Sequence, residues 1–257
     1  MKFATRILLP ILVLIVPTIM ANPLNIYTEE WSPISFSVDG KPDGLAVQVV
    51  QEIQKRIKNQ DPIKVVPWAR GWKMLTEQPN TVLFTMTRTT EREQMFTMIG
   101  PVAIGATNFY ALKNSGIKIT SLEDAKSAKA IGVYRASVEE RILLEQGFTN
   151  IAASSTPLLS AKQLIKHRID LWCNANLTAP SILTEAGASI DDVESLFTIS
   201  ANHLYIAFSR GTANEVIEQW KNSLAAIKAD GTFKTIYHAW LPMDEPPMQT
   251  ERIGPAH

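Results

Sequence analysis

The sequence predicts an α/β fold in which a mostly parallel sheet is covered by helices on both faces. Short apolar runs alternate with amphipathic stretches along the chain, and signals for helix starts recur after these runs. The 257 residues, 46% of them hydrophobic, can bury a substantial core and suffice for one large domain or for two lobes. We therefore expect an α/β protein of one or two compact units.

The first part of the chain alternates predicted strands with predicted helices. Leu45, Val49 and Ile53 recur every four residues, which predicts an amphipathic helix over residues 44–57. The other elements expected in this part are strands at 24–27, 34–38, 63–66 and 81–86 and a helix at 68–76.

Helix starts in the rest of the chain are predicted from a capping signal. A Ser or Thr followed three residues later by Glu or Gln satisfies two otherwise unpaired backbone N–H groups. This signal occurs at Thr90 with Glu93, Thr120 with Glu123, Ser137 with Glu140, Ser160 with Gln163 and Thr212 with Glu215. Further elements are expected as strands at 130–134, 169–173 and 204–208 and as a helix at 216–229.

The two ends of the chain differ from the rest in composition. Residues 1–21 begin with Lys2 and Arg6, continue with an apolar run too short for a transmembrane helix, and end in Ala21, which suits cleavage. We interpret 1–21 as a removed signal peptide; an uncleaved membrane anchor is the alternative. Residues 242–257 are rich in Pro and polar residues without periodicity, which predicts a disordered tail.

Charge and cysteine content exclude several classes of function. Removal of Lys2 and Arg6 turns a balance of 25 basic and 25 acidic residues into 23 against 25, so the chain has no basic excess for nucleic acid. The single cysteine, Cys173, cannot form an internal disulfide and is expected to be a small core residue. The four histidines are scattered, and no metal or cofactor is expected.

Six stretches follow one another over almost the whole chain after residue 22. They are Trp31 to Leu45, Val66-Pro67-Trp68, Thr85 to Arg92 with Gly100-Pro101, Ile131-Gly132-Val133 leading to Ser137, His167 to Asp170, and Ala229 to Phe233 with Trp240. In this order they resemble family 3 of the bacterial extracellular solute-binding proteins, which includes periplasmic receptors of polar amino-acid transporters. The stretch Thr85 to Arg92 is the most specific, because it is similar to the family's TxTxxR turn.

The resemblance implies a periplasmic-binding-protein-like fold of two α/β lobes joined by two crossing hinge strands. Lobe 1 would comprise residues 22–107 and 200–241, and lobe 2 would comprise residues 108–199. The resemblance also implies a periplasmic, monomeric protein that closes its lobes around a small polar ligand without covalent chemistry. The closed form would be read by an ABC transporter permease or by a membrane sensor.

The resemblance places the main ligand-binding residue at Arg92. A guanidinium offers a rigid fork of donors that matches a carboxylate, and it stays charged inside a cleft. The alternative is an exposed helical residue that pairs with Glu91 or Glu93. Thr85 and Thr87 alternate along the preceding strand and are expected to add hydroxyl groups around the same ligand group.

Aromatic and charged residues near the ends of other lobe 1 strands complete the candidate site on that side. Trp31 and Trp68 are expected to cover the apolar part of a ligand, with core or rim packing as the alternative. Arg70 is a second candidate positive charge, unless it is an exposed helical residue. Glu30 is the expected cleft-side carboxylate.

Lobe 2 is expected to contribute Ser137 and Asn174. Ser137 begins a helix whose N–H groups can bind an anionic group, and Asn174 follows a predicted strand. The family's amino-acid receptors usually carry an Asp near Ala175 that pairs with the ligand's ammonium group. Its absence here puts binding of standard amino acids in doubt, while a carboxylate-bearing ligand fits Arg92.

A periplasmic enzyme on the same scaffold is the alternative function, because some relatives are cyclohexadienyl dehydratases. Their chemistry needs a positioned general acid, and Glu30 is the candidate that the sequence offers. A receptor that regulates instead of transporting is the third possibility.

Overall fold

The computed structural model describes residues 23–242 and 244–255, so the predicted signal peptide at 1–21 lies outside the described residues. The described chain forms one sheet in the strand order β4-β1-β5-β10-β6-β9-β7-β8, with β11 paired to β6. A separate hairpin is formed by β2 and β3. The described helices include none that combines the length and apolarity needed to cross a bilayer.

The bounds of the elements agree closely with the predicted order. The strands are β1 (Asn25–Thr28), β2 (Phe36–Val38), β3 (Lys41–Asp43), β4 (Ile63–Val65), β5 (Thr81–Thr87), β6 (Thr97–Leu112), β7 (Ile131–Tyr134), β8 (Ile151–Ser154), β9 (Leu171–Ala175), β10 (Val193–Phe208) and β11 (Glu251–Ile253). The helices are α1 (Leu45–Ile57), α2 (Trp68–Glu77), α3 (Thr90–Met95), α4 (Leu122–Ala125), α5 (Val138–Glu145), α6 (Pro157–Ile165), α7 (Ala179–Ala186), α8 (Asn214–Ala229) and α9 (Thr232–Trp240), with a 3₁₀ turn at Ile190–Asp192.

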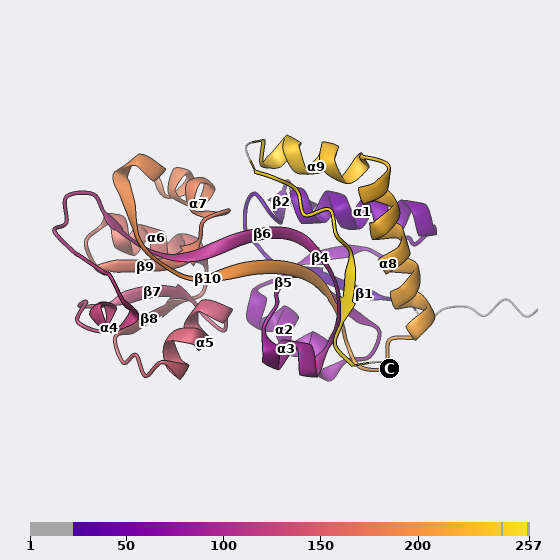
Figure 1. The fold of residues 1–257 in the computed structure, drawn as a ribbon, viewed down its shortest axis with the longest axis horizontal. Helices are drawn as coiled ribbons and strands as arrows, with labels where there is room; N and C mark the ends of the chain where they lie inside the picture. The colour runs from indigo at the N-terminus through magenta and orange to yellow at the C-terminus, as the bar shows by residue number, and fades with distance from the viewer. Residues whose placement is uncertain (1–22, 243, 256–257) are drawn as a thin grey trace, which may run out of the picture.

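Two lobes share the sheet, and two long strands connect them (Figure 1). Strands β6 and β10 each have 16 residues, pair antiparallel with each other, and run from one lobe into the other. This confirms the predicted fold of two α/β lobes joined by two crossing strands. The predicted lobe boundaries, 107/108 and 199/200, fall inside these strands.

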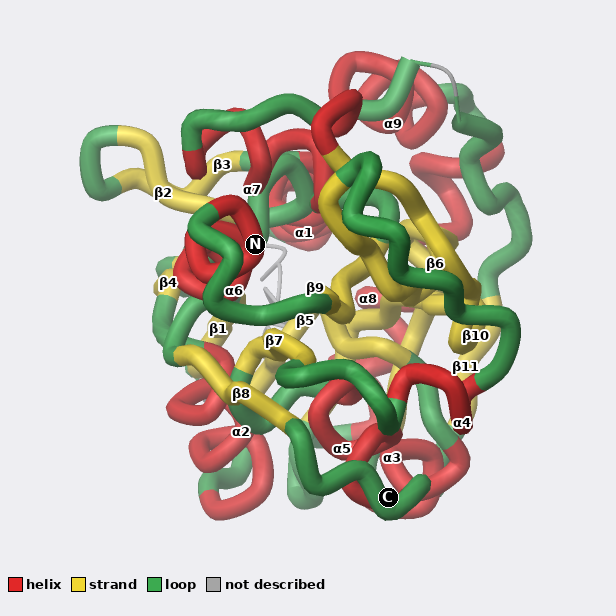
Figure 2. The backbone as a smooth tube through the Cα atoms, turned by 90° about the vertical axis from the view of Figure 1, so that its left-hand side faces the viewer, coloured by secondary structure: helices red, strands yellow, loops and turns green. Residues whose placement is uncertain are grey.

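Each lobe has a parallel core of three strands. In lobe 1, β1 pairs with β4 and β5, and in lobe 2, β7 pairs with β8 and β9. Helices lie on both faces, with α1, α8 and α9 opposite α2 and α3 in lobe 1, and α6 and α7 opposite α4 and α5 in lobe 2 (Figures 1 and 2). The carboxyl ends of these parallel strands face the junction of the lobes, where open α/β sheets bind ligands.

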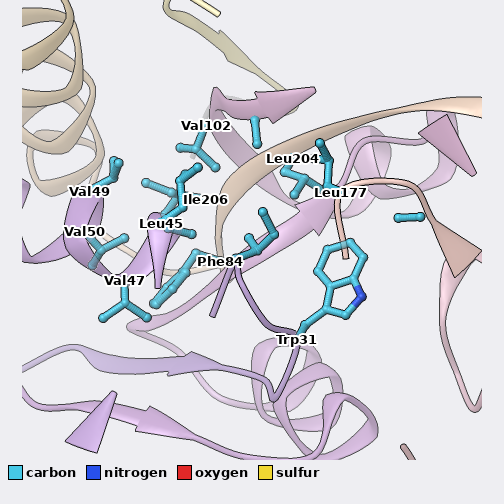
Figure 3. Packing of buried hydrophobic residues seen from close by; sticks show 14 of the residues in the cluster. Trp31, Leu45, Val47, Val49, Val50, Phe84, Val102, Leu177, Leu204 and Ile206 are labelled. Atoms are coloured by element: carbon cyan, nitrogen blue, oxygen red, sulfur yellow. The ribbon is translucent and has the colours of Figure 1, made fainter. Parts of the chain in front are cut away.

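The core of lobe 1 forms where α1 packs on the sheet. Leu45, Val49 and Ile53 are fully buried, as their four-residue spacing predicts. Figure 3 shows Leu45 beside Phe84 and Ile206 of the central strands. In lobe 2, Cys173 is a buried free thiol among apolar residues, in agreement with its predicted core role.

One of the five predicted helix caps is confirmed, and in the other four cases a different residue caps the helix. The Ser137 hydroxyl accepts a hydrogen bond from the Glu140 N–H and caps α5, as predicted. Ser160 lies inside α6 instead, because Thr156 caps this helix and Pro157 occupies its first turn. The other three helices are capped at Thr89, Ser121 and Ala213, one residue from the predicted positions.

The prediction of a disordered tail over residues 242–257 is wrong for residues 244–255. Strand β11 pairs antiparallel with β6, and Pro246 and Pro247 are buried against lobe 1. The Lys228 ammonium donates to the Gln249 carbonyl, and the Thr97 hydroxyl donates to the Pro255 carbonyl. The segment lacks periodicity because it is held by strand pairing and single contacts with lobe 1.

Candidate functional site

A small cavity of about 30 Å³ lies at the junction of the two lobes. Its walls come from the ends of β1, β5, β7 and β9 and from the first turns of α2, α3 and α5. Lobe 1 contributes Glu29, Trp31, Trp68, Thr85, Thr87 and Arg92, and lobe 2 contributes Tyr134, Ser137, Val138, Glu139, Cys173 and Asn174.

Arg92 lies in the floor of this cavity with only 3% of its surface exposed. Its guanidinium carbon lies 5.3 Å from the Trp68 ring and 5.1 Å from the Trp72 ring, and Nη1 donates to the Thr87 carbonyl at 2.9 Å. Its Nε has no hydrogen-bond partner among the described residues. Burial lowers the pKa of Arg92 to about 10, so the guanidinium remains charged at neutral pH.

The alternative role of Arg92, pairing with a neighbouring glutamate, is not found. Glu91 forms an ion pair with Arg141, and Glu93 forms one with Arg88. Arg92 therefore has neither glutamate as an ion-pair partner, and it lines the cavity.

Glu29 is a buried carboxyl group in the same cavity, and the sequence analysis missed it. Its side chain follows β1, and Oε1 accepts a hydrogen bond from the Thr85 hydroxyl at 3.3 Å. Oε2 is unpaired among the described residues. Burial, together with the charge of Glu139, raises the pKa of Glu29 to about 8, although Thr85, Arg92 and Tyr134 act in the opposite direction. Glu29 is therefore largely protonated at neutral pH.

The lobe 2 wall is built on the first turn of α5. Ser137 is buried as the helix cap, and Glu139, two residues further on, is 8% exposed. Glu139 Oε1 accepts from the Thr107 hydroxyl at 3.3 Å, and this hydroxyl accepts from Asn202 at 2.6 Å. The network connects α5 to the two crossing strands. Asn174 lines the cavity as well, with its amide donating to Thr178.

Hydrogen bonds join the lobes directly beside the cavity. The Trp68 indole donates to the Ala136 carbonyl at 2.9 Å, and the Trp68 backbone N–H donates to the Tyr134 hydroxyl at 2.7 Å. On the opposite side, the Ser181 hydroxyl donates to the Ser32 hydroxyl at 2.7 Å. Trp68 therefore connects the lobes in addition to lining the cavity.

Trp31, Thr85 and Thr87 line the cavity, so the structure brings them together with Arg92. Thr85 has a φ of 70°, and the pairing of β10 with β5 shifts register across this residue. A β-branched residue in the left-handed region is uncommon and is held there by its surroundings.

Two predicted site residues lie away from the cavity. Arg70 is exposed on α2 and does not line it. Glu30 accepts hydrogen bonds from the backbone and hydroxyl of Ser37 and lines a separate groove of about 400 Å³ between the lobes. The cavity carboxyl group of lobe 1 is thus Glu29 instead of Glu30; both follow β1, and they line different spaces.

Glu139 was also missed, although its position two residues after Ser137 places it in the first turn of the same helix. Acidic residues are common in first turns, so no sequence signal separates Glu139 from Glu140. Only the packing of α5 shows that Glu139 points into the cavity. Within 23–242 and 244–255, no group of three or more His, Cys, Asp or Glu side chains is placed to hold a metal ion.

Comparisons with known proteins agree with this architecture. The sequence model for bacterial extracellular solute-binding proteins, family 3, matches residues 24–243. No curated protein sequence matches the chain.

Three solved structures illustrate the likeness in fold. A histidine kinase sensor domain with similarity to periplasmic binding proteins has a TM-score of 0.78 at 20% identity, covering 87% of this chain and 99% of its own. A putative L-cystine ABC transporter from Listeria monocytogenes has a TM-score of 0.75 at 20% identity, covering 89% and 100%. An ancestral amino acid-binding protein, a precursor of cyclohexadienyl dehydratase, has a TM-score of 0.72 at 18% identity, covering 85% and 95%. At these identities the likeness shows the fold.

Proposed function

The chain belongs to family 3 of the bacterial extracellular solute-binding proteins, and from this premise we propose that it captures a small carboxylate-bearing solute in the periplasm. The observation that carries the proposal is one cavity with Arg92 on the lobe 1 side and the first turn of α5 on the lobe 2 side. A signal peptide at residues 1–21 would direct the protein to the periplasm. We propose that it acts there as a monomer.

Arg92 supports a carboxylate as the group that lobe 1 binds first. Its Nε has no partner among the described residues, and its Nη1 donates only to one carbonyl, so donors remain for a ligand. The guanidinium lies within cation–π distance of two indole rings, and its fork of donors suits bidentate binding of a planar carboxylate. The Ser137 end of α5 can add a hydroxyl and backbone N–H groups from lobe 2.

The size of the cavity supports binding by lobe closure. A volume of about 30 Å³ is far below the roughly 300–1,000 Å³ of typical ligand pockets. The lobes must therefore separate to admit a solute. A solute that contacts Arg92 and α5 at once would favour the closed arrangement over the open one by these additional contacts.

The closed form would be recognised by a membrane partner. The structures that resemble this chain include both a putative ABC transporter component and a histidine kinase sensor domain. We propose that either a transporter permease or a sensor binds the closed conformation, since closure of the lobes would present the same surface to both kinds of partner.

A thermal-shift screen over amino acids, organic acids and polyamines tests the proposal. A ligand that binds the folded state raises the melting temperature by mass action. We expect at least one carboxylate to do so in the wild type and not in Arg92→Met. The absence of any stabilising carboxylate, or an equal shift in the variant, would contradict the proposal.

A dehydratase activity is the second candidate, and Glu29 is the observation that favours it. A carboxyl group protonated near neutral pH beside a guanidinium can donate a proton to a leaving hydroxide, which departs as water while carbon dioxide is lost. Incubation with prephenate or arogenate, followed by absorbance of an aromatic product, tests this candidate. Product formation that Glu29→Gln abolishes would favour an enzyme. If no product forms, the proposed binding function stands and the dehydratase activity is ruled out.

A further inference from the structure

Two acidic side chains from opposite lobes line one small cavity. Glu29 of lobe 1 is 5% exposed and Glu139 of lobe 2 is 8% exposed. Among the described residues that line this cavity, Arg92 is the one basic side chain, and it is 3% exposed. If both carboxyl groups were ionised, the lining would carry two negative charges against one positive charge.

The hydrogen bonds to these two carboxyl groups are few and long. The Thr85 hydroxyl donates to Glu29 Oε1 at 3.3 Å, and the Thr107 hydroxyl donates to Glu139 Oε1 at the same distance. Oε2 of Glu29 has no partner among the described residues. The cavity of about 30 Å³ has room for no more than a few water molecules. Ionisation of both carboxyl groups in this space is therefore unfavourable.

We infer that closing of the two lobes takes up a proton, which Glu29 holds, so that acidification favours the closed form over the open form. With this proton bound, the carboxylate of Glu139 is balanced by the guanidinium of Arg92, and the lining becomes neutral. The inference rests on the proposed function only in that the lobes open and close. It does not depend on the chemistry of the solute.

The conflict between the two charges arises only when the lobes meet. Glu29 follows β1 of lobe 1, whereas Tyr134 and Glu139 belong to β7 and α5 of lobe 2. In the open form Glu29 would lie in solvent away from Glu139, so its pKa would return toward the ordinary value of 4.5. In the closed form, burial and the charge of Glu139 raise the pKa of Glu29 to about 8. A higher pKa in the closed form favours that form as the pH falls.

The other titratable groups of the lining leave this linkage to Glu29. They are Arg92 of α3, Tyr134 of β7, Glu139 of α5 and Cys173 of β9. Arg92 and Tyr134 lower the pKa of Glu29, but burial and Glu139 outweigh them. Burial raises the pKa of Tyr134 and that of Cys173, so neither of these groups ionises near neutral pH.

Small-angle X-ray scattering of the unliganded protein between about pH 5 and about pH 9 tests the inference. A protein with Ser32→Cys and Ser181→Cys serves as the closed reference, because a disulfide would replace the 2.7 Å hydrogen bond between these two hydroxyl groups of opposite lobes. We expect the radius of gyration of the wild type to increase with pH while that of the locked protein stays constant. The closing constant should fall by up to about tenfold per pH unit between the two pKa values of Glu29.

Glu29→Gln should remove this dependence on pH, because the amide cannot take up the proton. Lys228 also titrates in the range, since burial lowers its pKa to about 7. Its ammonium donates to the carbonyls of Pro101 and Gln249 in lobe 1, and it is unchanged in the variant. The difference between the wild type and Glu29→Gln therefore isolates the proton on Glu29.

Two further glutamates provide matched controls. Glu30→Gln changes the neighbouring residue, which bonds to Ser37 and does not line the cavity, so the dependence on pH should remain. Glu91→Gln removes an ion pair with Arg141 that joins α3 to α5 outside the cavity lining. This variant should be more open at every pH and should keep the dependence on pH. Circular dichroism checks that all variants fold.

The contrary outcomes separate the inference from the proposed function. A wild type that is more open than the locked protein, but to the same extent at every pH, overturns the inference and leaves lobe closure intact. Equal dependence on pH in the wild type and Glu29→Gln, or its loss in Glu30→Gln, also overturns the inference alone. A wild type that matches the locked protein at every pH overturns both the inference and the opening on which the proposed function depends.

Discussion

The two walls of the cavity are built on different principles. In the lobe 1 wall, Arg92 lies near two indole rings and donates to a carbonyl, and the returning C-terminal segment packs against the end of its helix. The lobe 2 wall is the first turn of α5, where Ser137 is occupied as the helix cap and Glu139 makes one long bond. A cationic wall beside aromatic rings therefore faces a wall built on the start of a helix.

This difference indicates an order of events. If the lobes close on a solute as we propose, Arg92 of lobe 1 would bind it in the open form, and the groups of lobe 2 would contact it only once it is enclosed. The following predictions probe this contrast between the walls.

Loss of the lobe 1 guanidinium should have the largest effect. Arg92→Met removes the charged donor and leaves Glu29 and Glu139 facing each other without it, so we expect ligand affinity to fall by about 2–5 kcal/mol. Arg70→Met is the matched control, because Arg70 is an exposed arginine of the same lobe. Calorimetry with the best ligand of the screen measures both; similar affinities in the two variants would show that the lobe 1 wall does not anchor the ligand.

Removal of the C-terminal segment should be the next largest effect. A chain ending at residue 242 loses β11 and one carbonyl acceptor of the buried Lys228, so we expect its free energy of unfolding to fall by about 2–4 kcal/mol. Denaturant unfolding measures this loss. An unchanged midpoint would mean that the segment does not support lobe 1.

A glycine in this segment gives a subtler version of the same test. Gly254 has a φ of +94°, and an added Cβ would lie 2.1 Å from the carbonyl oxygen of Phe96, directly behind α3. Gly116 also has a positive φ, +75°, but its Cβ would meet nothing within 4 Å. Gly254→Ala should therefore be clearly less stable than Gly116→Ala.

The unliganded protein should become more stable as the pH falls from about 8 to about 4.5. Folding raises the pKa of Glu29 from 4.5 to about 8, so the folded protein keeps a proton that the unfolded chain releases in this range. The free energy of unfolding rises by at most about 1.4 kcal/mol per pH unit, and the rise stops below the pKa of Glu29 in the unfolded chain.

The quantity to measure is the difference in unfolding free energy between the wild type and Glu29→Gln, because other groups titrate in the same range. Lys228 is one of them, since burial lowers its pKa to about 7. Parallel curves for the two proteins between pH 4.5 and 8 would show that Glu29 is ionised at neutral pH.

The smallest effect is expected at the lobe 2 wall. Ser137→Ala and Thr156→Ala each remove a helix cap in the same lobe and should each cost about 1 kcal/mol of stability. Only Ser137 lines the cavity, so only its variant should also weaken ligand binding, by severalfold. Equal ligand affinities in both variants would show that Ser137 caps α5 and does not contribute to ligand binding.

Much of the fold follows from local patterns in the sequence. The four-residue spacing of Leu45, Val49 and Ile53 predicted α1, and the alternation of apolar runs predicted most strands. The returning segment at 244–255 could not be predicted in this way, because its order depends on an edge of β6 more than 140 residues earlier in the chain. Prolines in such a segment indicate the absence of a helix and do not show whether the chain is packed.

The candidate site was predictable where a motif or a strand end identified a residue, as at Arg92, Trp68 and Ser137. It was not predictable for the two glutamates, because Glu29-Glu30 and Glu139-Glu140 are adjacent pairs in which only tertiary packing decides which carboxyl group is buried. Of two neighbouring glutamates, one therefore lines the cavity and the other does not, and the sequence alone does not show which.

The contact between β6 and the end of β9 has a consequence for how affinity can change. Ala106 exchanges two backbone-directed hydrogen bonds with Asn176, and an added Cβ on Gly105 would lie 2.7 Å from the Asn176 side chain. This contact attaches the crossing strand β6 to the segment after β9, at residues that do not line the cavity. A substitution there would alter the fraction of molecules that are competent to bind, and with it the apparent dissociation constant, while every group that touches the solute stays the same.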